Sequence, residues 1–147
     1  MSMKTNNFFL ITMLSLMMFA LTSCDKETVL NINDTPSEIQ AYIKTHFPAA
    51  TVAQIIKDRD GFTKGYEVFL NDGTKLEFNS KNAITDIDGN KQLPNSVIPD
   101  RILTYVNTNF SSNVITDWEL DDKNQKVGLD NDLELLFNMS GDFLRLD

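Results

Sequence analysis

Cysteine and histidine are nearly absent from this chain, which has one of each, Cys24 and His46. A single cysteine excludes an intramolecular disulfide and any metal site built from several cysteines. A single histidine leaves little from which to assemble a zinc site or a Ser-His-Asp triad. His46 stands near the end of a helical pattern, where backbone carbonyls favour a cationic imidazole, so we expect it to be structural. We therefore predict no catalytic residues, no metal site and no cofactor.

Basic residues are also scarce, since 13 Lys and Arg stand against 21 Asp and Glu and the formal net charge is −8. A surface this acidic disfavours binding to nucleic acid and to anionic lipid headgroups, because both are negatively charged. We predict that nucleic acid is not a partner, and that any attachment to a membrane depends on a lipid anchor rather than on surface charge.

The N-terminus differs from the rest of the chain. Residues 8–21 are a predominantly apolar run of 14 residues. A membrane-spanning helix needs roughly 20, so this run is typical of the core of a signal peptide. The segment "LTSC", which ends at Cys24, resembles the lipobox of bacterial lipoproteins, in which the cysteine is acylated and becomes the new N-terminus. We predict a signal peptide at residues 1–23, followed by a lipidated N-terminus and polar tether at residues 24–35.

These features predict a lipoprotein of the bacterial cell envelope, anchored in the outer membrane through a lipid on Cys24. The alternative is an ordinary signal peptide followed by an unmodified thiol. Asp25 leaves the membrane leaflet open, because an acidic residue after the cysteine accompanies inner-membrane retention in some bacteria and surface export in others. Residues 1–23 carry one charge, on Lys4, so their removal would change the net charge from −8 to −9.

One pattern occurs twice along the remaining chain. At an offset of 63 residues, the identical pairs join Pro36, Ile39, Tyr42, Thr45, Phe47 and Asp58 to Pro99, Ile102, Tyr105, Thr108, Phe110 and Asp121. At an offset of 59, they join Val68, Leu70, Leu76, Phe78, Asn79 and Asp88 to Val127, Leu129, Leu135, Phe137, Asn138 and Asp147. The offset changes within a turn, where a difference in length costs little. We predict two copies of one unit, at residues 36–89 and 97–147.

Each copy has a helical pattern followed by alternating runs. Apolar residues recur at helical spacing in residues 36–47 and again in residues 99–110. The alternating runs that predict strands are residues 51–58, 65–70, 74–79 and 83–88, and then 114–121, 125–129, 133–138 and 142–146. "NDG" at Asn71 to Gly73 is a strong hairpin signal, and short hairpin connections make neighbouring strands antiparallel.

From these elements we predict an α+β domain over residues 36–147. It consists of two tandem copies of a helix followed by a four-stranded antiparallel meander, with the helices packed on one face of the sheet. One copy of about 55 residues buries too little apolar surface alone, whereas two copies side by side form a core of sufficient size. Trp118, at the position equivalent to Ile55, is expected in that core.

The segment "GYEVFLNDGTKLEFNSKNAITDIDG", residues 65–89, resembles the PepSY-like family, often described as putative beta-lactamase-inhibitor-like and common among exported proteins of Bacteroidota. The resemblance covers residues 36–147 and is weaker in the second copy, where Gln125 replaces Tyr66 and Asp132 replaces Gly73. It implies the fold of an inhibitor whose two helix-and-sheet repeats grip an enzyme with an open sheet face. It supplies no catalytic residues.

Strict alternation places a mixed set of side chains on the sheet face opposite the helices. Those expected there are Glu67, Phe69, Lys75, Glu77, Ile84, Asp86, Lys126, Glu134, Leu136, Phe143 and Arg145. Apolar anchors among charges are typical of a protein-binding surface, so we predict that Phe69, Ile84, Leu136 and Phe143, with Glu67 and Arg145, bind a protein or peptide partner. The alternative is that they are scattered surface hydrophobes.

Carboxylates suggest a second function. "DIDGN" at residues 86–90 and "DWELDD" at residues 117–122 lack the spacing of a calcium-binding loop. Asp residues in predicted turns are explained by the hydrogen bonds they accept from the backbone. We therefore expect a non-enzymatic, lipid-anchored envelope binding protein that inhibits or modulates an exported enzyme, and keep as the alternative a small-molecule or cation-binding module that uses acidic turns.

Overall fold

A computed structural model describes residues 28–58 and 65–147 of this chain. The predicted signal peptide and Cys24 lie outside the described residues. Within them, no helix is both long enough and apolar enough to cross a membrane. Residues 28–35, expected to belong to a tether, form a short strand, β1 (Thr28–Val29), and a 3-10 turn, η1 (Ile32–Asp34).

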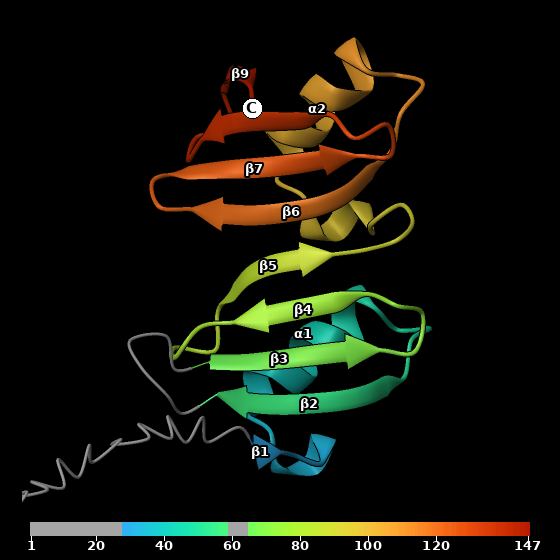
Figure 1. Ribbon diagram of the computed structural model, residues 1–147, viewed down its shortest axis with the longest axis vertical. Coiled ribbons are helices and arrows are strands. Elements are labelled where there is room, and N and C mark those ends of the chain that lie inside the picture. Colours follow the sequence, from blue (N-terminus) through green and yellow to red (C-terminus); the bar gives the residue numbers. More distant parts are fainter. Residues whose placement is uncertain (1–27, 59–64) are drawn as a thin grey trace, which may run out of the picture.

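The described chain builds one antiparallel sheet with two α-helices (Figure 1). The strands after β1 are β2 (Val52–Asp58), β3 (Gly65–Leu70), β4 (Lys75–Phe78), β5 (Ile84–Asp88), β6 (Ile115–Asp121), β7 (Asn124–Leu129), β8 (Glu134–Asn138) and β9 (Phe143–Leu146). The helices are α1 (Ser37–His46) and α2 (Asp100–Asn109), and a second 3-10 turn, η2 (Asn95–Val97), precedes α2. Neighbours in the sheet are neighbours in the sequence, in the order β1 to β9.

The predicted architecture of two tandem helix-plus-meander units is wrong. The structure is dominated by a single nine-stranded sheet, and no boundary divides the described strands into two units of four. β5 pairs directly with β6, with Asp86 opposite Glu119 and Asp88 opposite Asp117. β1 adds a further strand beside β2. The physical reason is that a separate meander would leave the backbone groups of β5 and β6 unpaired at an edge, whereas a continuous ladder satisfies them.

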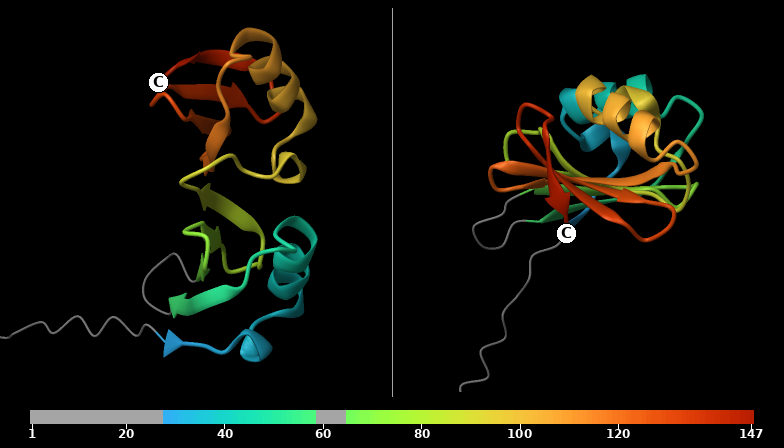
Figure 2. Two further views of the ribbon diagram at one scale, coloured as in Figure 1. Left: turned by 90° about the vertical axis from the view of Figure 1, so that its right-hand side faces the viewer. Right: turned by 90° about the horizontal axis from the view of Figure 1, so that it is seen from above.

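Both helices cover the same face of the sheet (Figure 2). Pro36 and Pro99 stand immediately before α1 and α2, where a missing N–H leaves no helical hydrogen bond unmade. Each helix turns one apolar stripe toward the sheet, through Ile39 and Ile43 in α1 and through Ile102 and Val106 in α2. These side chains pack with alternate residues of the strands into one buried core.

Trp118 on β6 belongs to this core, as predicted, with an exposed fraction of 7%. Its indole Nε1–H donates a hydrogen bond of 3.1 Å to Gln125 Oε1, so the polar end of the ring is satisfied where it is buried. His46 is the last residue of α1, as expected, and its Nδ1 lies 2.9 Å from Ser96 Oγ. The first contact belongs to the core, and the second links the end of α1 to η2.

Candidate functional site

The sheet face that points away from α1 and α2 is called here the open face. Among the described residues no helix lies on it (Figure 2). Strand pairing aligns its side chains in two rows that run across the sheet. One row contains Glu67, Glu77, Asp86, Glu119, Lys126, Leu136 and Arg145, and the other contains Phe69, Lys75, Asp88, Asp117, Gly128 and Glu134.

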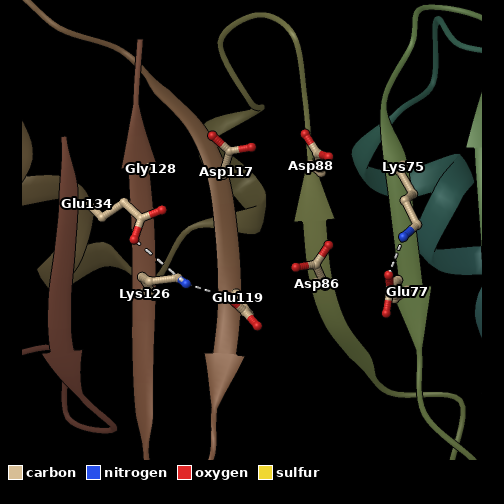
Figure 3. A pocket seen from close by; sticks show the side chains of 9 residues that line it. All are labelled: Lys75, Glu77, Asp86, Asp88, Asp117, Glu119, Lys126, Gly128 and Glu134. Carbon is tan, nitrogen blue, oxygen red and sulfur yellow. Dashed lines mark hydrogen bonds and ion pairs between the residues drawn. The ribbon is translucent and has the colours of Figure 1, made fainter. Parts of the chain in front are cut away.

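The middle of the open face is hollowed into a groove of about 320 Å³ (Figure 3). We call it the acidic groove. It is lined by Lys75, Glu77, Asp86, Asp88, Asp117, Glu119, Lys126, Gly128 and Glu134, which come from strands β4 to β8. Six of these residues are carboxylates and two are lysines, which gives the groove a formal charge of −4 at neutral pH.

The two lysines lie on either side of the groove and each is paired with glutamate. Lys75 on β4 binds Glu77 of the same strand. Lys126 Nζ on β7 lies 3.0 Å from Glu119 Oε2 and 3.8 Å from Glu134 Oε2. Bonding to Glu77 raises the pKa of Lys75, and bonding to Glu119 raises the pKa of Lys126, so both stay charged at neutral pH. The lysines therefore offset two of the three glutamate charges at the sides of the groove, and the three aspartates in its centre have no lysine partner.

Asp86 lies in that centre, half-buried on β5. Burial raises the pKa of its carboxyl group to about 6, and the charges of Glu77 and Glu119 on the flanking strands act in the same direction. Glu77 and Glu119 stand directly opposite Asp86 on either side. Like charges in such positions repel one another, so the open face holds a carboxylate in an unfavourable position.

Asp117 and Asp88 form a second pair of opposed carboxylates at the junction of β5 and β6. Burial raises the pKa of Asp117, and the neighbouring Asp88 carboxyl group adds to that effect, although the Thr116 hydroxyl donates a hydrogen bond of 2.6 Å to Asp117 Oδ2. Gly128 makes room for this carboxylate, because a Cβ there would lie 2.6 Å from Asp117 Oδ2. A larger residue at position 128 would displace Asp117 from the groove.

Replacing Asp86 with asparagine is expected to stabilise the protein near pH 7.5 by about 1 kcal/mol and to have little effect below pH 4. The pKa of Asp86 is raised from 3.8 to about 6, so the folded state holds this proton more tightly than the unfolded state does. Its stabilising contribution is therefore complete below pH 3.8 and is lost as the pH rises through about 6. The pKa shift alone would correspond to a larger free energy, but Asp86 is only half-buried, and screening by solvent reduces the expected effect to about 1 kcal/mol.

Thermal unfolding of the wild-type chain and of the Asp86→Asn variant from pH 4 to 8 measures this effect. The melting temperatures of the two proteins should be similar at pH 4, and that of the variant should be the higher one above pH 6. A difference in melting temperature that stays constant from pH 4 to 8 would show that the pKa of Asp86 is not raised in the folded state. Glu38→Gln, on the exposed first turn of α1, is the control and should not produce stabilisation that grows with pH.

The chemistry available in the acidic groove is the binding of positive charge. Within residues 28–58 and 65–147, no three His, Cys, Asp or Glu side chains converge to hold a metal ion. The lining also contains no serine, cysteine or histidine that could act as a nucleophile or as its base. Carboxylates on a two-row grid can instead accept hydrogen bonds from several cationic donors at separate points.

Four of the predicted partner-binding residues lie on the open face. Glu67 and Phe69 are half-buried on β3, beside Glu77 and Lys75. Arg145 is exposed on β9, and its Nη2 lies 2.6 Å from Asp147 Oδ1. Leu136 on β8 has an exposed fraction of only 2%. Phe69 and Leu136 are five strand spacings apart, about 24 Å, so they do not form one apolar patch.

Ile84 and Phe143 do not lie where alternation predicted. Ile84 stands opposite Phe78 and Phe143 stands opposite Phe137, and both Phe78 and Phe137 are core residues. The ring of Phe143 stacks on Tyr105 of α2, with the ring centroids 4.7 Å apart. The cause is a register shift in each strand pair, which inserts one residue and moves every following side chain to the other face.

Alternation in the sequence places Glu77, Asp86 and Glu134 on the face opposite the helices, but it does not place Asp88, Asp117 and Glu119 there. In the sequence, Asp88 belongs to "DIDGN" and Asp117 and Glu119 belong to "DWELDD", neither of which has the spacing of a calcium-binding loop. The available signal was the alternation of acidic residues, Asp86 with Asp88 and Asp117 with Glu119, in two runs that each predicted a strand. The pairing of β5 with β6, which brings the two runs together, has no counterpart in the local pattern.

A family model described as "Putative beta-lactamase-inhibitor-like, PepSY-like" matches residues 20–64 and 64–145. No curated protein matches the chain.

Three solved structures share the fold. A protein from Bacteroides thetaiotaomicron, described as a putative calcium-regulated periplasmic protein, is 30% identical with a TM-score of 0.78, and the match covers 82% of this chain and 96% of that one. A putative periplasmic protein of the DUF2874 family from Bacteroides vulgatus is 34% identical with a TM-score of 0.78, covering 84% and 98%. Another putative periplasmic protein of unknown function from Bacteroides vulgatus is 35% identical with a TM-score of 0.77, covering 82% and 98%.

Proposed function

We propose, from the premise that this chain belongs to the PepSY-like family of putative beta-lactamase-inhibitor-like proteins, that it is a non-enzymatic binding protein of the bacterial cell envelope. A lipid on Cys24 holds it at the outer membrane, and its open face docks on an exported protein whose activity it inhibits or modulates. The family description supports an inhibitor-like role, and the periplasmic descriptions of the solved relatives are consistent with this location.

The observation that carries the proposal is the open face, on which no helix of residues 28–58 and 65–147 lies. A sheet face without a covering layer exposes side chains from many strands on one rigid surface, and here that surface contains a groove of about 320 Å³ between β4 and β8. Phe69 supplies a half-buried apolar contact next to the groove, because it stands opposite Lys75. A surface with an apolar contact beside charged groups is typical of protein interfaces.

Site-specific photocrosslinking in the bacterium that produces the chain tests this proposal. A benzophenone amino acid at position 69 on the open face is expected to give a discrete crosslinked protein. The same amino acid at position 44, exposed on α1 on the other side of the sheet, is the matched control and should yield at least fivefold less. Equal yields from the two positions, or no product from position 69, would contradict docking at the open face.

A second candidate is the binding of a divalent cation, and one observation favours it. The solved relative from Bacteroides thetaiotaomicron is described as calcium-regulated, and the acidic groove of this chain gathers six carboxylates. The sequence suggests a cation-binding module that uses acidic turns, whereas the residues of the groove lie on strands. The described carboxylates do not converge on one point, so protein docking is the better-supported function.

A further inference from the structure

We infer that the docked partner presents a basic peptide segment, whose arginine or lysine side chains enter the acidic groove between β5 and β6. This inference rests on the proposed function and specifies the chemistry of the partner. It is carried by the distribution of charge in the groove, by the spacing of its carboxylates and by the extent of the face around it.

Most of the charge at the sides of the groove is offset by lysines, whereas the charge in its centre is not. Glu77, Glu119 and Glu134 each have a lysine partner. Asp86, Asp88 and Asp117 form no ion pair among the described residues, although Asp88 stands directly opposite Asp117 and Asp86 directly opposite another carboxylate on β6. Carboxylates directly opposite one another destabilise a sheet. A cation supplied from outside the chain would remove this repulsion, which gives a basic partner a source of affinity that a neutral one lacks.

The spacing of the central carboxylates suits extended cationic side chains. Neighbouring strands place them about 5 Å apart, and alternate residues of one strand place them about 7 Å apart. Arginine carries five N–H donors in a planar fork, so one guanidinium can bond to two carboxylates of such a grid. A single metal ion would instead need three or more ligands at about 2.0–2.6 Å from one point. The described side chains offer no such convergence.

The extent of the face favours a polypeptide over a small polyamine. Cross-strand pairs align charged residues from Glu67 on β3 to Lys126 on β7, a distance of about 19 Å. Phe69 lies beside this row and offers an apolar contact that a polyamine would not use. A peptide segment can place basic side chains in the groove and an apolar side chain against Phe69 in the same binding event.

A peptide titration tests the inference. The probe is a fluorescently labelled hexa-arginine peptide, added to the full chain in a mild non-ionic detergent at low ionic strength and near pH 7.5. The matched probe is the same peptide with citrulline in place of every arginine, which keeps the shape and removes the charge. We expect binding of the arginine peptide at least tenfold tighter than that of the citrulline peptide. Equal affinities would overturn the inference.

Variants separate the position of the charge from the total charge. Asp86→Asn/Asp117→Asn removes two carboxylates from the centre of the groove, and Glu38→Gln/Asp100→Asn removes two from the first turns of α1 and α2. We expect the groove variant to bind the arginine peptide about tenfold more weakly and the helix variant to change less than twofold. The same loss in both variants would show only a response to net charge and would sink the inference.

Two further results distinguish the competing explanations. Calcium chloride alone, at about 1 mM, should not change the melting temperature of the wild-type chain, and a stabilisation that the groove variant abolishes would identify a metal site instead. Crosslinking from position 69 tests docking independently. If a partner is still crosslinked but the arginine preference is absent, only the basic-partner inference fails. If no partner is crosslinked, the proposed function itself fails.

Discussion

Replacing Ile87 with alanine is expected to lower the free energy of unfolding by about 2–5 kcal/mol and to destabilise both ends of the sheet together. Ile87 is fully buried on β5, between Leu76 on β4 and Trp118 on β6. Removal of its side chain leaves a cavity at the strand pair that joins the earlier strands to the later ones. Because one ladder runs through β5 and β6, we expect the two ends of the sheet to unfold together.

Urea unfolding followed by two probes measures this effect. Trp118 is the only tryptophan, so its fluorescence reports on β6, while hydrogen exchange of the β2 and β3 amides reports on the other end of the sheet. The two probes should give the same midpoint in the wild-type chain, and both midpoints should fall together in the variant. Separate midpoints would show that the chain unfolds as two units. Leu144→Ala, at a side chain 49% exposed, is the control and should change stability by about 0.5 kcal/mol or less.

Local patterns in the sequence located the elements well. Eight of the nine described strands and both α-helices lie within one or two residues of the predicted ranges. Apolar periods of two and of about 3.6 are properties of single elements, so they survive whatever the tertiary arrangement is. β1 was not predicted, because two residues are too few to show an alternation.

Short hairpin connections predict the pairing within each run of four strands, but nothing in these patterns predicts the pairing across the long connection between β5 and β6. Period and spacing do not reveal which strands pair across a connection of this length, so the sequence offers no reason to join β5 to β6 rather than to leave each as an edge. For this single reason the sequence predicts neither the continuous sheet nor the complete acidic groove. β5 and β6 each carry acidic residues on the open face, and their pairing brings these residues together into one negative surface.

Bulges explain the remaining misplaced residues. Strict alternation assigns the side chains of β5 and β9 to the two faces as if the pairing of these strands with β4 and β8 contained no bulge. A register shift between Glu77 and Phe78, and another between Leu136 and Phe137, reverses the assignment for Ile84 and Phe143. A bulge requires no unusual residue, and neither Thr85 nor Leu144 marks its position in the sequence. Glu67 and Phe69, on a strand paired with β4 without a shift, were placed on the correct face.

The two phenylalanines predicted to share the open face should respond very differently to the same substitution. Phe143→Asp is expected to lower the free energy of unfolding by about 3–5 kcal/mol, because it removes an aromatic contact and brings a carboxylate against apolar rings. Phe143 stacks on Tyr105 and meets Phe137 edge to face, with centroids 5.7 Å apart. Phe69→Asp should cost about 1 kcal/mol or less, because Phe69 faces away from the core beside Lys75.

Chemical unfolding of both variants, with Phe143→Leu as a conservative control, measures the difference. Phe143→Leu keeps an apolar side chain and should lose less than half as much stability as Phe143→Asp. Equal, small losses from the two aspartate variants would place Phe143 on the open face and restore strict alternation through β9. A severe loss from Phe69→Asp would instead mean that the open face is covered, and docking there would then be untenable. The pair thus tests the bulge in β9 and the exposure of the open face with one substitution.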